Sequence, residues 1–191
     1  MAVNGGFVLQ KGEGRAVHVL GNDLTIKISS RDTNGSYTVF EATVAPLAGP
    51  PLHRHPDHDE SWYILEGEYR FQVDRREIHA RTGDTVFAPR GSVHTFQNVT
   101  DQPGRLLTTI VPGGVDEFFE ELETVVPRGT APDPATMGPV FAKHRQELLG
   151  PPLATRQQAL PTGPAQAFRR RHPSGTTLRY HPVMQPSSES R

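Results

Sequence analysis

The residues from Pro50 to Gly67 read PPLHRHPDHDESWYILEG and contain three histidines and four acidic residues. His53 and His55 are two positions apart, so on a β-strand their side chains leave the same face. Glu60 follows across PDHD, whose proline and aspartates suit a short loop. Imidazoles with a carboxylate are typical transition-metal ligands. A solvated polar loop has the same composition, so this stretch alone leaves both interpretations open.

A second stretch, GDTVFAPRGSVHTFQN at 83–98, favours the metal interpretation. Gly83-Asp84 and Pro89-Arg90-Gly91 indicate turns on either side of the β-rich run TVFA. The chain then enters a further strand that carries His94 and Phe96. His94 is therefore a candidate for a third imidazole beside the first stretch.

At this point the sequence resembles the cupin superfamily. The first cupin motif is matched by His53, His55, Glu60 and Gly67, and the second by Gly83, Pro89, Gly91, His94 and Asn98. The resemblance is strong over about residues 40–112. The body of the chain looks like single-domain cupins of the quercetin dioxygenase-like group.

The resemblance implies that His53, His55, Glu60 and His94 hold one divalent transition metal. Three neutral imidazoles and one carboxylate suit Fe, Ni, Mn, Co, Cu or Zn, and they leave one or two positions for water or substrate. A structural zinc site would more often use thiolates, and this chain has no cysteine. The alternative is a cupin that keeps these residues without binding a metal.

Four strand residues are candidates for the substrate pocket, namely Trp62, Ile64, Phe71 and Phe96. Core packing is the default for such side chains. By alternation, however, Trp62 shares a face with Glu60, and Phe96 shares a face with His94. We therefore expect Trp62 and Phe96 beside the metal. The sequence leaves the strand register at Arg70 and Gln72 open, and a shift of one residue would turn both toward the cavity.

The elements that must position these residues are short β-rich runs. They lie between Phe7 and about Val111, and turn residues separate them every 8–12 positions, which predicts an all-β sandwich or barrel. Helical periodicity follows at 113–126 and at 132–150. We therefore predict a single cupin jelly-roll barrel at 1–112, two α-helices packed on it at 113–153, and an irregular basic tail at 154–191.

Composition limits the classes of partner. The formal net charge of −1 gives no reason to expect nucleic acid or a membrane surface. The segment 154–191 has six arginines and one acidic residue, is rich in proline, and is expected to be largely disordered. Its RRR run at 169–171 could touch an anionic partner, although a solvated tail is favoured.

No signal peptide or spanning segment is evident, so a cytoplasmic location is expected. Unpaired barrel edges favour a homodimer.

Three functions are consistent with this sequence. The leading hypothesis is a metal-dependent dioxygenase that acts on a small organic substrate, aromatic or enolic, with Glu60 as both ligand and proton acceptor. A second is an isomerase, epimerase, lyase or cyclase that uses the metal as a Lewis acid. The third is a non-catalytic cupin that binds a metal or a small ligand.

Overall fold

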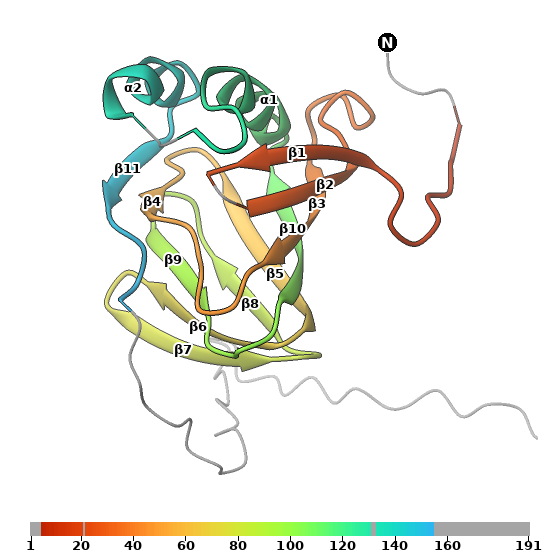
Figure 1. The fold of residues 1–191 in the computed structure, drawn as a ribbon. Coiled ribbons are helices and arrows are strands. Elements are labelled where there is room, and N and C mark those ends of the chain that lie inside the picture. Colours follow the sequence, from red (N-terminus) through yellow and green to blue (C-terminus); the bar gives the residue numbers. More distant parts are fainter. Residues whose placement is uncertain (1–4, 21, 131–132, 155–191) are drawn as a thin grey trace, which may run out of the picture. The chain divides into compact units, whose positions relative to one another are not determined.

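The computed structural model describes residues 5–20, 22–130 and 133–154, and within them the chain forms two facing β-sheets followed by two helices (Figure 1). The strands are β1 (Arg15–Val19), β2 (Asn22–Ile28), β3 (Thr38–Val44), β4 (Leu52–Arg54), β5 (Asp59–Glu66), β6 (Glu68–Val73), β7 (Arg76–Arg81), β8 (Thr85–Ala88), β9 (Val93–Asn98), β10 (Gly104–Val111) and β11 (Glu147–Gly150). The helices are α1 (Val115–Val125) and α2 (Pro134–Lys143). The predicted class, all-β with two helices after the strands, is confirmed.

One sheet has the order β1-β2-β3-β10-β5-β8, and the other has the order β11-β4-β9-β6-β7. Buried and more exposed residues alternate along β3 and β10, as expected for strands with one face in the core. The core between the sheets contains fully buried side chains from both, including Trp62, Tyr69, Phe71 and Leu106. This packing gives a jelly-roll-like barrel that can hold polar side chains at fixed positions inside it.

The register at β6 answers the question that the sequence left open. Phe71 lies opposite Phe96, and both rings are buried, with their centroids 5.4 Å apart. Arg70 is on the other face of the strand, where it donates hydrogen bonds to the Gln97 side chain at 3.0 Å and to the Ala154 carbonyl at 2.7 Å. Arg70 and Gln72 therefore point away from the barrel interior.

Helix α1 is anchored to the barrel by a buried carboxylate. The oxygens of Asp116 accept hydrogen bonds from the backbone N–H and hydroxyl of Ser30, both at 3.0 Å, and from the hydroxyl of Thr38 at 2.9 Å. The apolar face of α1 packs on the strands, where Phe119 makes an edge contact with Phe40 at 5.2 Å between ring centroids. The helix therefore closes one end of the barrel, as Figure 1 shows.

The predicted second helix at 132–150 is wrong in its second half. Helix α2 ends at Lys143, and Glu147–Gly150 forms the strand β11, paired antiparallel with β4. Arg145 has a φ of 52°, in the left-handed region, which ends the helix and redirects the chain. The main chain of β11 then satisfies the open edge of β4.

The predicted tail lies outside the described residues from 155 onward. Among the described residues, no helix combines the length and the apolar character needed to cross a membrane. The homodimer stays a prediction, and sedimentation across a wide concentration range would test it.

Candidate metal centre

The four candidate ligands come together inside the barrel. One donor atom from each of His53, His55, Glu60 and His94 can be chosen so that all four lie within 4.8 Å of one another. A carboxylate oxygen of Glu60 is 3.1 Å from Nε2 of His94 and 3.2 Å from Nε2 of His55. His55, Glu60 and His94 are buried, and His53 is partly exposed. The group therefore has the composition and the spacing of a metal-binding site.

Strand pairing positions these side chains. His53 in β4 is directly opposite His94 in β9, and Glu60 lies near the start of β5 in the other sheet. His55 follows the end of β4, and its carbonyl accepts a hydrogen bond from the N–H of Gly91 at 2.9 Å. Gly91 has a φ of 79°, which a side chain would disfavour, so glycine suits this turn. The turn of the second motif thus holds His55, a candidate ligand of the first motif.

Hydrogen bonds donated by their Nδ1 atoms orient the imidazole rings of His53 and His94. Nδ1 of His53 is 2.7 Å from the carbonyl of Pro51, and Nδ1 of His94 is 3.0 Å from the carbonyl of Ser92. A carbonyl only accepts hydrogen bonds, so Nδ1 must carry the proton in both rings. Their Nε2 atoms are therefore the ones left for a metal, which would displace the proton that Nε2 of His94 shares with Glu60.

The electrostatics of the group fit a cation. Burial and the neighbouring His94 and His55 lower the pKa of His53 to about 3, so its ring is neutral near pH 7. Burial alone would raise the pKa of Glu60, but the hydrogen bonds with His55 and His94 outweigh it and lower that pKa. Lone pairs and a carboxylate that face one point repel each other unless a proton or a metal ion lies between them. A divalent metal would satisfy all of these donors at once.

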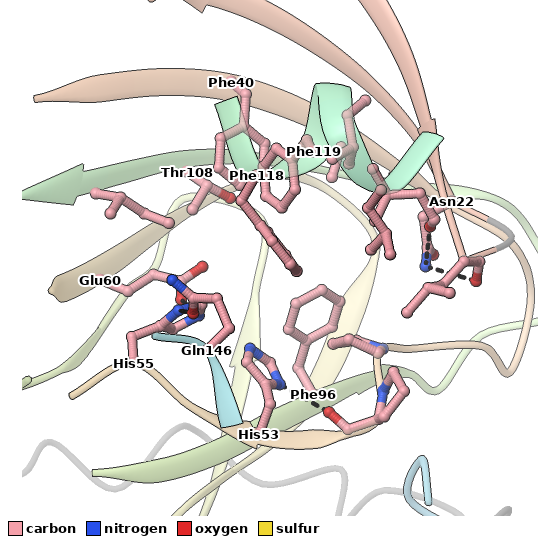
Figure 2. Close-up of a pocket in the computed structure, with 18 of the residues that line it drawn as sticks. Asn22, Phe40, His53, His55, Glu60, Phe96, Thr108, Phe118, Phe119 and Gln146 are labelled. Carbon is pink, nitrogen blue, oxygen red and sulfur yellow. Dashed lines mark hydrogen bonds and ion pairs between the residues drawn. The ribbon is translucent and has the colours of Figure 1, made fainter. Parts of the chain in front are cut away.

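The group lies at one end of a cavity of about 820 Å³, a volume that includes its open mouth. Figure 2 shows His53, His55 and Glu60 on one side and Asn22 on the other. The walls between them are mostly apolar and come from the barrel and from α1, including Phe40, Trp62, Phe96, Phe118, Phe119 and Leu122. None of the residues that line the described cavity is a lysine, an arginine or an aspartate.

The four pocket candidates separate into two pairs. Trp62 and Phe96 line the cavity, where the sequence places them. Ile64 and Phe71 are not among the lining residues, and both side chains are fully buried in the core. Alternation assigns a residue to the inner face of a sheet, but it does not say how far along the barrel the cavity reaches.

The structure also adds a residue that the sequence analysis did not single out. Gln146, between α2 and β11, lines the cavity and is hydrogen-bonded through Oε1 to Nδ1 of His55. It is 91 positions after His55 and belongs to neither motif, so no spacing signal in the sequence could have indicated it.

Residues 40–110 match the family model described as the cupin domain. The chain belongs to the cupin family. Every residue of both motifs named from the sequence lies inside the matched range, so the four candidate ligands are all part of the cupin domain itself. Helices α1 and α2 and strand β11 lie outside the match.

Curated relatives of this cupin include the quercetin 2,3-dioxygenase of Bacillus subtilis, 28% identical over 117 residues, which are 61% of this chain and 34% of that enzyme. An uncharacterized protein of Methanocaldococcus jannaschii is 32% identical over 86 residues, covering 45% of this chain and 69% of the relative. The chain therefore spans only about a third of the Bacillus enzyme. Among solved structures, KdgF from Halomonas sp. is similar with a TM-score of 0.52 and 16% sequence identity. The match covers 60% of this chain and 99% of the KdgF chain, and at this identity it supports the fold alone.

Proposed function

We propose that this cupin is a metal-dependent dioxygenase that acts on a small, uncharged organic substrate with an aromatic or enolic group. The observation that carries the proposal is the three-histidine, one-glutamate group, of which His53, His55 and Glu60 line an apolar cavity. The similarity to the Bacillus quercetin 2,3-dioxygenase supports the same chemistry. The partial coverage of that enzyme leaves the activity as a proposal.

The proposed ligands are His53, His55, Glu60 and His94, which is also the set that the cupin motifs imply. A bound transition metal would supply a Lewis acid for a substrate oxygen and a centre for activating dioxygen. Because three imidazoles are neutral and one ligand is anionic, a divalent metal would leave a net positive charge at the site, which would stabilise the enolate or phenolate formed when the substrate loses its proton. In the simplest stoichiometry both atoms of dioxygen enter the products, so no external reductant is needed.

Glu60 is proposed to take up the substrate proton. The lowered pKa keeps its carboxylate ionised near neutral pH, so it has a lone pair to accept a proton. A weak base of this kind suits an acidic enol or phenol rather than an ordinary alcohol. Trp62 and Phe96 line the cavity as apolar walls and would exclude water from the reacting group.

The cavity favours an apolar substrate. Apolar side chains dominate its described lining. No lysine or arginine among the lining residues would pair with a phosphate or a second carboxylate. Oxalate and sugar phosphates are therefore suitable negative comparators for substrate trials.

The test begins with metal analysis of protein purified without chelator, followed by loading with Fe, Ni, Co or Mn. Oxygen uptake is then measured with flavonols, diketones and small enols, with His94→Ala as the control that lacks one ligand. Metal-dependent oxygen uptake would support the dioxygenase. Turnover without oxygen uptake would favour a non-redox isomerase, epimerase, lyase or cyclase, and ligand binding without any turnover would favour a binding cupin.

A further inference from the structure

The imidazole of His55 is held differently from those of the other two candidate histidines. His53 and His94 each bond through Nδ1 to the backbone carbonyl two positions earlier, at Pro51 and Ser92. His55 instead bonds through Nδ1 to the side chain of Gln146. Two rings are therefore oriented by the cupin domain itself, and the third by a residue outside it.

The orientation of the Gln146 amide determines which nitrogen of His55 carries the proton. The Nε2 of Gln146 donates a hydrogen bond to the carbonyl of His144 at 3.2 Å. A carbonyl cannot donate, so the amide nitrogen must face His144 and the amide oxygen must face His55. The Nδ1 of His55 then carries a proton, and its Nε2 is the atom that faces Glu60 and the centre of the site.

Gln146 is itself firmly placed. The residue is only 6% exposed, and its backbone N–H donates to the carbonyl of Phe141 at 2.8 Å. The preceding residue, Arg145, forms an ion pair with Asp57 at 2.9 Å in the loop between His55 and Glu60. The segment after α2 is thus attached to the ligand loop beside the Gln146 contact.

The strand that follows continues this attachment. Glu147 accepts hydrogen bonds from the guanidinium of Arg54, and Leu148 is the cross-strand partner of His53. Consecutive residues 145–148 therefore contact the loop and strand that carry His53 and His55. The close-up in Figure 2 shows Gln146 beside His55 and Glu60.

We propose that Gln146 is a positioning residue of the metal centre, holding His55 in the Nδ1–H tautomer with Nε2 directed at the metal. The proposal rests on the metal site of the proposed function. Without the acceptor, the ring can rotate or move its proton to Nε2, where a proton blocks coordination. Outer hydrogen-bond partners of metal-bound histidines typically contribute about 10–100-fold to metal affinity.

Three full-length variants separate the hydrogen bond from general packing. Gln146→Leu keeps much of the side-chain volume and removes the acceptor, so Co(II) affinity, measured by chelator competition, should fall about 10–100-fold. Gln146→Glu keeps an acceptor oxygen and should bind Co(II) at least as tightly as the wild type. Leu149→Ala, an exposed change in the adjacent strand β11, is the matched control and should leave affinity unchanged. Equal weakening by Gln146→Leu and Gln146→Glu would overturn the proposal.

A second readout needs no metal. In ¹⁵N-labelled, metal-free protein, the Nδ1–H proton of His55, hydrogen-bonded to Gln146, should exchange slowly with solvent in the wild type and in Gln146→Glu. In Gln146→Leu it should exchange much faster, while the Nδ1–H protons of His53 and His94 stay unchanged. Unaltered exchange of the His55 Nδ1–H proton in Gln146→Leu would overturn the proposal. If wild-type protein binds no Co(II) at all while this exchange pattern holds, the metal-enzyme function fails, and Gln146 positions His55 for another purpose.

Discussion

His53 and His94 are direct cross-strand partners in the antiparallel pair β4–β9, with ring centroids 4.4 Å apart. Residues opposite each other in such a pair have Cβ atoms about 4.5–5.5 Å apart. The register of two short strands therefore brings together imidazoles that are 41 positions apart in the sequence. A slip of one residue would turn one of them to the outside of the barrel.

Replacing His94 by alanine tests whether the metal serves chemistry or stability. The variant loses one of three neutral donors, and water can fill the gap. We expect metal affinity to fall by more than the about 10–100-fold typical of losing an outer hydrogen-bond partner, while the melting temperature stays close to that of metal-loaded wild-type protein. Chelator competition and thermal unfolding by circular dichroism measure the two effects. A melting temperature that collapses in the variant, in step with metal loss, would indicate a structural ion.

Glu60→Gln separates the ligand role of Glu60 from its role as proton acceptor. The amide keeps the shape and an oxygen donor but has no negative charge and cannot accept the substrate proton as the carboxylate does. Compared at equal metal occupancy, kcat should fall about 10²–10⁴-fold, the usual contribution of a general base. Activity that simply follows the amount of bound metal would mean that Glu60 is a ligand only.

Asp116→Ala should destabilise the packing of α1 on the barrel. Asp116 is only 1% exposed, and its carboxylate accepts three hydrogen bonds from Ser30 and Thr38, which would lose their partner inside the protein. We expect the free energy of unfolding to fall by about 3 kcal/mol, as measured by urea denaturation. Asp101→Ala, in an exposed turn, is the control and should stay within about 0.5 kcal/mol of wild type. An equal decrease in the free energy of unfolding in both variants would contradict the role of Asp116 as an anchor of α1.

Tyr69→Phe should stabilise the protein. Tyr69 is fully buried, its hydroxyl has no hydrogen-bond partner within the described part of the chain, and burial raises the pKa of Tyr69 above its ordinary value. Removing the hydroxyl should raise the free energy of unfolding by about 1 kcal/mol in urea titrations.

Gly104→Ala provides a linked check on Tyr69. A Cβ at Gly104 would lie 2.2 Å from the Tyr69 hydroxyl oxygen, so the single change should be destabilising. The double variant with Tyr69→Phe should recover part of that loss in a double-mutant cycle. Strict additivity of the two changes would show that the hydroxyl and Gly104 do not meet.

The sequence by itself indicated the barrel, the first helix and the four candidate ligands. These features depend on local patterns: alternation along strands, helical periodicity in 113–126, and two short motifs that place turns next to histidines. Short-range spacing dictates which face a side chain leaves, so Trp62 and Phe96 could be assigned to the cavity before the fold was known.

Only the tertiary structure decided the rest. Leu148 has the spacing of a helix face, yet it lies in β11 because the open edge of β4 offers hydrogen bonds that outweigh local helical preference. Phe71 has the alternation of a cavity residue but packs in the core. Gln146 meets His55 across 91 positions, and no local pattern encodes such a contact, because it arises from how distant elements pack.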